Sequence, residues 1–288
     1  MEYSGYGKIN LGLDVVGKRA DGYHDLRMIM QTIQLRDLVD IQTEPSDEVS
    51  IEMTCSDESL SCEDDNLCVK AAKLVLDKCS TPVKVTIHLE KNIPIAAGLA
   101  GGSADASAVM EGLNDMLNLG LSKEELMEMG VKIGADVPYC IMKGTALAEG
   151  IGDKLTELRP MVNYPIVIAK PPEGVSTGFV YGNLDLDNVK HPDIDRIAKA
   201  INDGDIIGVT SNMGNVLETV TIRKLPVIDN IKRIMLDYKA LGAMMSGSGP
   251  TVFGIFPNEH QASKALSFLK KSGLCDRALI TYVYNNTH

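Results

Sequence analysis

A segment of small residues, 94–107, contains the chemistry that is easiest to interpret in this chain, and it reads PIAAGLAGGSADAS. Glycines and alanines let a backbone approach a ligand closely, and a helix predicted over residues 104–117 follows at once. The N–H groups at a helix N-terminus, and the positive end of its dipole, favour a bound phosphate. The segment therefore indicates a phosphate-binding loop. A glycine-rich turn that only lets a helix pack closely is the alternative.

Two residues of this loop have expectations of their own. Ser103 lies at the start of the predicted helix, so its hydroxyl either caps the helix or reaches a phosphate or Mg²⁺. Ala100 carries a Cβ, so ordinary backbone angles are expected there. The loop is neither a Walker A motif, which needs G-x-x-x-x-G-K-[ST], nor a good dinucleotide fingerprint.

Composition limits the classes of partner. The chain has 288 residues, 44% of them hydrophobic, and a net charge of −11. Nucleic acids and anionic membranes select clustered Lys and Arg, so neither is an expected partner. The N-terminus lacks the pattern of a secretory signal, and the six cysteines lack zinc-ligand spacing. These features predict a cytoplasmic protein with reduced thiols and no metal site of its own. For the oligomeric state, a monomer and a homodimer both stay open.

Strands and helices are both predicted, in an irregular order. Period-two alternation predicts strands in the first third of the chain: residues 8–15, 38–41, 49–53 and 83–88. Residues 145–158 predict a β-hairpin that turns at 150–153. Because the βαβ alternation is irregular, the sequence favours an α+β fold of two domains, residues 1–160 and 161–288.

Two helix starts have sequence signals. One-sided apolar spacing predicts a helix over residues 66–78, with Asp64 or Asp65 as its N-cap. Ser122 and Glu125 form a predicted capping box at the start of another helix.

Three segments match the motifs of a known superfamily. They are GKINL at residues 7–11, the loop at 94–103, and SGSGPT at 246–251. In this order they resemble the GHMP kinases, which include galactokinase, homoserine kinase and mevalonate kinase. The resemblance implies an N-terminal domain like the second domain of ribosomal protein S5 and a C-terminal ferredoxin-like domain.

Within the superfamily, three further segments are similar to the kinases that act on 4-diphosphocytidyl-2-C-methyl-D-erythritol. They are KINLGLDVVGKRADGYHDL at residues 8–26, GADVPYC at 134–140 and AEGIGD at 148–153. The resemblance implies transfer of the ATP γ-phosphoryl to the 2-hydroxyl of that cytidine-diphosphate-linked substrate, in the non-mevalonate isoprenoid pathway, with Mg²⁺ accompanying ATP. Two alternatives stand beside it: another GHMP kinase, of homoserine or mevalonate type, and a non-catalytic nucleotide-binding module.

The resemblance implies catalytic roles for Lys8 and Asp136. Asp136 would accept the proton of the substrate hydroxyl, and Lys8 would stabilise charge on the transferring phosphoryl. From the residues alone, Asp136 equally fits a cap of the turn before Pro138, and Lys8 a solvated lysine on a strand.

The resemblance also implies which residues bind the two ligands. ATP would be bound by Asn66, Pro94, Ala96, Gly98, Leu99, Ala100, Gly101, Gly102 and Ser103. Asn66 equally fits the N-cap of the helix that follows it. Asn10 would hydrogen-bond the erythritol part of the substrate.

Cytidine would be read by aromatic residues. Tyr23 would stack on the pyrimidine, His24 would hydrogen-bond a base edge, and Tyr181 would cover the other face of the ring. Phe179 lies two residues from Tyr181 and competes for that place. An ordinary hairpin turn around Gly22 is the alternative for the first two residues.

The chain departs from the family pattern at several positions. Ala100 and Ala104 stand where Gly and Ser are common, which leaves Ser103 as the remaining hydroxyl for a phosphate or Mg²⁺. Residues 215–218 read NVLE where the family commonly has NDLE.

Overall fold

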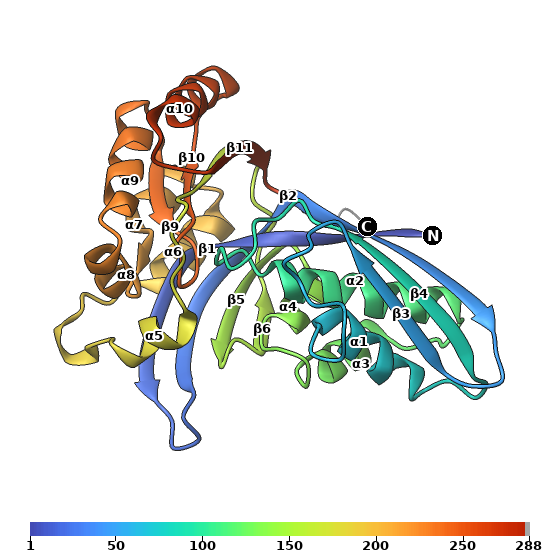
Figure 1. The fold of residues 1–288 in the computed structure, drawn as a ribbon. Coiled ribbons are helices and arrows are strands. Elements are labelled where there is room, and N and C mark those ends of the chain that lie inside the picture. Colours follow the sequence, from blue (N-terminus) through green and yellow to red (C-terminus); the bar gives the residue numbers. More distant parts are fainter. Residues whose placement is uncertain (286–288) are drawn as a thin grey trace. The chain divides into compact units, whose positions relative to one another are not determined.

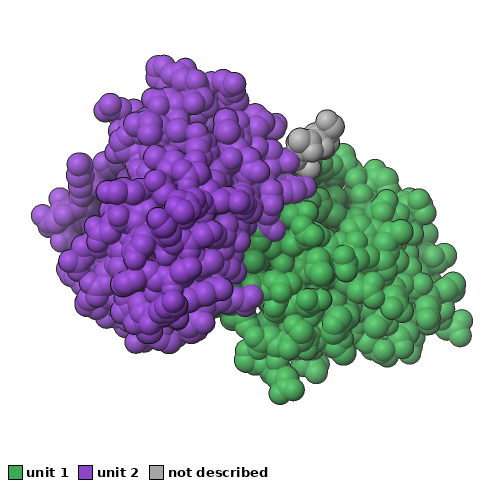
Figure 2. Space-filling model, turned by 90° about the horizontal axis from the view of Figure 1, so that it is seen from above, with its two compact units in different colours: residues 1–7, 35–95, 100–143 green, residues 8–34, 96–99, 144–288 purple. Residues whose placement is uncertain are grey.

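The computed structural model describes residues 1–285 and divides them into two compact units, which are coloured separately in Figure 2. Unit 1 comprises residues 1–7, 35–95 and 100–143. Unit 2 comprises residues 8–34, 96–99 and the chain from residue 144 onward. Both units are discontinuous because the two longest strands, β1 (Glu2–Lys18) and β2 (His24–Pro45), contribute residues to each. The boundary predicted at residue 160 stays a prediction.

Unit 1 packs four helices on a small sheet (Figure 1). β3 (Ser50–Cys55) runs parallel to β4 (Val83–Glu90), which is antiparallel to residues 38–45 of β2. The helices are α1 (Leu67–Leu76), α2 (Gly101–Met116), α3 (Lys123–Gly130) and α4 (Val137–Met142). Their apolar faces bury Val75, Val109 and Leu126 with Ile41 and Ile87 of the sheet in one core. The burial follows from the alternation of apolar residues along the strands.

Unit 2 contains a four-stranded antiparallel sheet in the order β11-β7-β10-β9. The strands are β7 (Pro165–Lys170), β9 (Gly242–Met245), β10 (Val252–Ile255) and β11 (Arg277–Tyr282). Helix α9 (Val227–Asp237) packs against β9 and β10, and α10 (Glu259–Ser272) packs against β7 and β11. A strand order of fourth, first, third, second, with a helix before the second and before the fourth strand, is that of the predicted ferredoxin-like domain.

The remaining elements of unit 2 include three strands attached to β1 and β2 and several short helices. β5 pairs with residues 26–31 of β2 and forms a hairpin with β6, as the sequence predicted, and β8 runs parallel to β1. These strands are β5 (Thr145–Gly150), β6 (Lys154–Glu157) and β8 (Gly214–Asn215). The helices are α5 (Thr177–Gly182), the 3₁₀ turn η1 (Leu186–Asn188), α6 (Ile194–Asp203), α7 (Ile206–Asn212) and α8 (Glu218–Lys224). Across residues 1–285, no helix is long and apolar enough to span a bilayer.

Helix starts test the local sequence signals directly. The predicted capping box is confirmed: Ser122 Oγ accepts from the Glu125 N–H at 3.2 Å, and the Ser122 N–H donates to Glu125 Oε2 at 2.8 Å. The prediction of Asp64 or Asp65 as the cap of α1 is wrong. Asn66 has the extended backbone of an N-cap, and its Oδ1 accepts from the Cys68 N–H at 2.8 Å.

Two glycines on α2 give a matched test of this packing. A Cβ added at Gly112 would lie 2.7 Å from Ile41 Cδ1 and 2.8 Å from Tyr3 Cδ2, whereas one added at Gly102 would meet only Leu67 Cδ1 at 3.4 Å. Gly112→Ala should lower the free energy of unfolding by about 1–3 kcal/mol through overpacking. Gly102→Ala should leave it unchanged or raise it by up to about 1 kcal/mol. Urea unfolding followed by circular dichroism measures both, and equal losses in the two variants would contradict the packing described.

Candidate active site

The phosphate loop turns through left-handed backbone conformations. Ala96 has φ 50°, Gly98 φ 74° and Ala100 φ 58°. The expectation of ordinary angles at Ala100 is therefore wrong, because the loop must reverse direction immediately before α2 begins at Gly101. A left-handed alanine costs about 1–2 kcal/mol, so the surrounding contacts hold the loop in this conformation.

Within unit 2, residues 96–99 of this loop contact the C-terminal glycine-rich loop. A Cβ on Gly98 would collide with the carbonyl oxygen of Ser246, so only glycine fits there. Ser246 Oγ donates to the Gly98 carbonyl at 2.9 Å. On the other side, the Lys8 N–H donates to the Leu99 carbonyl at 3.0 Å, and the Leu99 side chain is buried. These contacts fasten the loop to β1 and to the turn after β9.

Lys8 and Asn10 lie side by side on β1. Lys8 is 5% exposed, so the interpretation as a solvated strand lysine is wrong. Its Nζ donates to Asn10 Oδ1 at 2.8 Å, and the Gly247 N–H donates to the same oxygen at 3.0 Å. Asn10 is fully buried, and its Nδ2 points to Met28 Sδ at 3.4 Å. The network therefore holds a buried ammonium at a defined position.

Within unit 1, Ser103 and the turn that bears Asp136 are neighbours. Ser103 is the third residue of α2, whose N-cap is Ala100, so the serine does not act as the helix cap. A Cβ added at Gly134 would lie 3.8 Å from Ser103 Oγ. That distance is an ordinary van der Waals contact, so the turn at Gly134 and the first turn of α2 lie next to each other.

Asp136 precedes α4 with helical backbone angles, φ −83° and ψ −13°, rather than the extended angles of a capping residue. Among residues 1–285 its side chain makes no capping hydrogen bond to α4. The turn-cap interpretation is therefore not supported. Asp136 belongs to unit 1 and Lys8 to unit 2.

Asn66 has a confirmed structural role. Besides its bond to the Cys68 N–H, its Nδ2 donates to the Ser61 carbonyl at 2.6 Å. The side chain therefore anchors both the preceding loop and α1. Its contact with adenine stays a prediction.

The residues predicted to bind cytidine differ in exposure and in their contacts. A turn with Gly22 at φ 89° is present, as the alternative interpretation expected, and it leaves Tyr23 59% exposed. His24 stacks obliquely on Tyr181, with ring centroids 5.1 Å apart. Phe179 instead lies under Lys224 Nζ, 3.8 Å from its ring centroid. Burial, with a smaller contribution from Lys18, lowers the pKa of His24, which favours the neutral imidazole.

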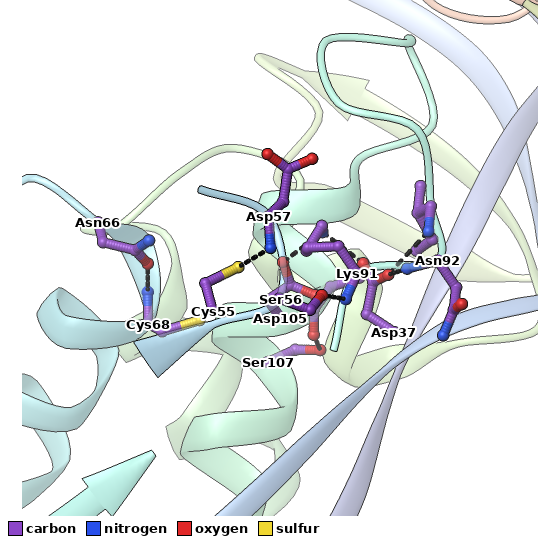
Figure 3. A network of polar contacts seen from close by, with 12 residues as sticks. Asp37, Cys55, Ser56, Asp57, Asn66, Cys68, Lys91, Asn92, Asp105 and Ser107 are labelled. Carbon is purple, nitrogen blue, oxygen red and sulfur yellow. Dashed lines mark hydrogen bonds and ion pairs between the residues drawn. The ribbon is translucent and has the colours of Figure 1, made fainter. Parts of the chain in front are cut away.

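A buried charged cluster next to the phosphate loop was not predicted (Figure 3). Lys91 Nζ donates to Asp37 and, at 2.7 Å, to Asp105 Oδ2, and all three side chains are almost inaccessible. Asp37 also accepts the N–H groups of Asn92 and, at 2.7 Å, Ile93. The cluster thus ties together the chain that enters the phosphate loop and the helix that leaves it. We call these three residues the Lys91 cluster.

The protonation of the Lys91 cluster follows from its burial. Burial, together with the neighbouring Asp37 carboxylate, raises the pKa of Asp105 well above its usual range. Burial lowers the pKa of Lys91, but Asp105 and Asp37 outweigh it, so the pKa is raised overall. Asp105 Oδ1 is buried without a hydrogen-bond partner among the described residues. A proton on Asp105 therefore leaves Lys91 with one carboxylate and the cluster without net charge.

One sequence signal pointed toward this cluster. Asp105 is a charged residue inside a helix of small apolar residues, and a buried charge needs a partner. Nothing in the local spacing identifies the partners, because Asp37 and Lys91 come from distant parts of the chain.

Known families match both parts of the chain. A family described as the GHMP kinases N terminal domain matches residues 66–144, and one described as GHMP kinases C terminal matches residues 186–274. A 4-diphosphocytidyl-2-C-methyl-D-erythritol kinase of Lachnospira eligens is 51% identical over 267 residues, 92% of each chain. Another from Clostridium perfringens is 47% identical over 289 residues, 100% of each chain. The chain belongs to the GHMP kinases, in the family of the 4-diphosphocytidyl-2-C-methyl-D-erythritol kinases.

Solved structures agree with this membership. A 4-(cytidine 5'-diphospho)-2C-methyl-D-erythritol kinase has a TM-score of 0.84 at 29% identity, covering 99% of this chain and 100% of its own. A homoserine kinase from Cytophaga hutchinsonii has a TM-score of 0.79 at 18% identity, covering 98% of this chain and 94% of its own, and shows the shared fold alone. The predicted two-domain GHMP kinase fold is confirmed, and membership of this kinase family implies that the chain uses ATP.

The Lys91 cluster predicts opposite behaviour for its two carboxyls. A carboxyl whose pKa is raised in the native state contributes stability that is fully present below the unfolded value of about 3.9 and is lost as pH rises through the native value. Asp105→Asn removes that loss. The stability of the variant relative to the wild type should therefore increase as pH rises above about 4.

Asp37→Asn is the matched comparison. The Asp37 carboxylate accepts from three donors, which are Lys91 Nζ and the N–H groups of Asn92 and Ile93, and an amide would offer them a donor nitrogen or a weaker acceptor oxygen. It should cost about 3–5 kcal/mol at pH 7, as expected for breaking a buried ion pair. Urea unfolding of both variants at several pH values measures this difference. A pH-independent effect of Asp105→Asn would contradict the assigned proton.

Proposed function

We propose that this chain transfers the γ-phosphoryl group of ATP to the 2-hydroxyl of 4-diphosphocytidyl-2-C-methyl-D-erythritol. The strongest support is sequence identity: about half of the residues are identical, over nearly the full length, to those of relatives that bear this kinase name. The structures of homoserine and mevalonate kinases share the fold at only 16–19% identity, and so do not favour those substrates.

The phosphates of ATP are proposed to bind at the N-terminus of α2. This helix is 16 residues long and begins in the glycine-rich loop, so its first N–H groups and its dipole favour an anion. Ser103 adds a hydroxyl on the first turn. The predicted contacts of Pro94, Ala96, Gly98, Leu99, Ala100, Gly101 and Gly102 belong to the same loop. One Nδ2 hydrogen of Asn66 donates to the Ser61 carbonyl, and its Oδ1 accepts from the Cys68 N–H. We propose that the second Nδ2 hydrogen donates to adenine.

Mg²⁺ belongs to this proposal as the companion of ATP. Among residues 1–285, no three His, Cys, Asp or Glu side chains are grouped as metal ligands. Phosphate oxygens, water and the Ser103 hydroxyl are the ligands that fit a hard cation here. The ion would neutralise charge on the phosphates.

Proton and charge transfer are assigned to two residues. Asp136 is proposed to accept the proton of the attacking hydroxyl, from a turn that lies against the first turn of the phosphate-binding helix. The buried ammonium of Lys8 is proposed to stabilise the charge that develops on the transferring phosphoryl, because an ion is most effective where water is excluded.

Cytidine is proposed to bind at the aromatic residues of unit 2. His24 and Tyr181 already lie together, and the exposed ring of Tyr23 is available for stacking on the pyrimidine. A neutral His24 both donates and accepts a hydrogen bond, which suits the edge of a cytosine. Asn10 is assigned to the erythritol part. We keep the cytoplasm, which the sequence indicates, as the proposed location, and a monomer or a homodimer as the proposed state.

ADP release tests the proposed reaction. Purified protein with ATP and Mg²⁺ should release ADP rapidly with 4-diphosphocytidyl-2-C-methyl-D-erythritol and not with homoserine, mevalonate or no acceptor. CDP should inhibit by competing with the acceptor, because the aromatic residues read the base. Release with homoserine or mevalonate instead would reject the proposed substrate, and ATP binding without release to any acceptor would favour the binding module.

Asp136→Asn should lower kcat by about 100-fold or more, because it removes the proton acceptor while keeping the shape of the side chain. The dissociation constant of ATP, measured by calorimetry, should stay within about twofold, since a base contributes little to ground-state binding. Asp47→Asn, on an exposed turn, is the control and should behave as the wild type. Near-normal turnover of Asp136→Asn would remove this residue from the base role.

A further inference from the structure

Residues 215–218, the NVLE segment, hold the C-terminal glycine-rich loop in place. Asn215 is 6% exposed, and its Nδ2 donates to the carbonyls of Met245 at 2.9 Å and Gly247 at 2.8 Å. Its Oδ1 accepts from the Leu217 N–H at 3.0 Å. Both Nδ2 hydrogens and the carbonyl are thus committed to the backbone. A buried amide with every group satisfied fixes the groups that it contacts.

Glu218 fixes the same loop from the other side. Its Oε1 accepts from the Met245 N–H at 2.8 Å, and its Oε2 accepts from Lys232 Nζ at 2.7 Å. Met245 is therefore held at both its N–H and its carbonyl by the two polar residues of one segment. The end of β9 and the first residues of the loop cannot shift without breaking these bonds.

The loop transmits this position to β1 through Gly247. The Gly247 N–H donates to Asn10 Oδ1 at 3.0 Å, which also accepts from Lys8 Nζ at 2.8 Å. A Cβ on Gly247 would lie 3.0 Å from the Gly98 carbonyl oxygen and 3.5 Å from Lys8 Nζ. The backbone of Gly247 therefore borders the space in which the ammonium lies.

We propose that Asn215 is a positioning residue for Lys8, acting through Gly247 and Asn10. The role of Lys8 in phosphoryl transfer rests on the proposed function, whereas its placement by Asn215 rests on the contacts themselves. Displacing a reacting or stabilising group by about 1 Å can cost on the order of 100-fold in rate. The Asn215 side chain bonds the backbone of Met245, Gly247 and Leu217, so its effect on the ammonium passes through the loop.

The substitution Asn215→Asp tests this with almost no change in shape. The introduced carboxylate would face the two carbonyl oxygens to which Nδ2 donates, so Gly247 should move. We expect kcat to fall about 10- to 100-fold at pH 8, with the KM values and the dissociation constant of ATP changed less than about threefold. The kcat relative to the wild type should recover as pH falls, because a protonated carboxyl again donates one hydrogen bond.

A double-mutant cycle tests the route through Asn10. If Asn215 acts through Asn10, then Asn10→Ala combined with Asn215→Asp should be no more than about twofold slower than the slower single variant. Losses that multiply would overturn the proposed route. If the wild-type protein releases no ADP, the proposed function is contradicted. The placement of Lys8 can then still be tested by chemical labelling, which needs no substrate.

Chemical labelling of Lys8 reads its placement directly. Acetylation by acetic anhydride, quantified peptide by peptide by mass spectrometry, should be several times faster at Lys8 in Asn215→Asp than in the wild type. Asn114→Asp is the control, because Asn114 also bonds a backbone carbonyl and a backbone N–H, both of Leu121, far along α2. It should lower the melting temperature yet leave kcat and Lys8 labelling unchanged. Unchanged Lys8 labelling in Asn215→Asp would overturn the proposal, whatever the reaction.

Discussion

The close approach of two backbones at Gly98 and Gly247 is the contact on which the candidate site in unit 2 depends. A side chain on Gly98 would collide with the Ser246 carbonyl, and one on Gly247 would press on the Gly98 carbonyl. Because neither has a side chain, the phosphate loop and the C-terminal loop meet through their main chains. Asn10 Oδ1 then accepts from both Gly247 and Lys8. The position of the ammonium therefore depends on the packing of these two main chains and on the Asn10 side chain that joins Gly247 to Lys8.

In unit 1, buried charged side chains hold the two ends of the phosphate loop. A loop that offers its N–H groups to phosphate has few internal bonds of its own, so its two ends must be held from outside. The Lys91 cluster does this because Asp37 accepts from the N–H groups of Asn92 and Ile93, whereas Lys91 donates to Asp105 on α2. A buried ion pair contributes little net stability, but it fixes geometry, since breaking one bond leaves a charge without a partner.

The fold and most of the motifs could be predicted from the sequence. The features that could not be predicted depend on tertiary contacts. The GHMP motifs, the hairpin of β5 and β6 and the capping box at Ser122 are local, and the structure has them. The Lys91 cluster joins residues 37, 91 and 105, which share no local pattern. The left-handed angles of Ala100 arise from loop closure, against the preference of alanine itself. Likewise, the contact of His24 with Tyr181 joins residues far apart in the sequence and has no local signal.

The departure at residue 216 lies within the segment that holds the C-terminal glycine-rich loop. Val216 stands where the family commonly has Asp, yet its side chain is buried, and its N–H donates to the Leu13 carbonyl at 3.1 Å. It faces the core beside β1, whereas Asn215 and Glu218 face the loop. A valine satisfies a buried apolar site without needing a hydrogen-bond partner. The two polar residues that flank it supply every side-chain bond from this segment to Met245 and Gly247, so the loop keeps its support although the motif is altered.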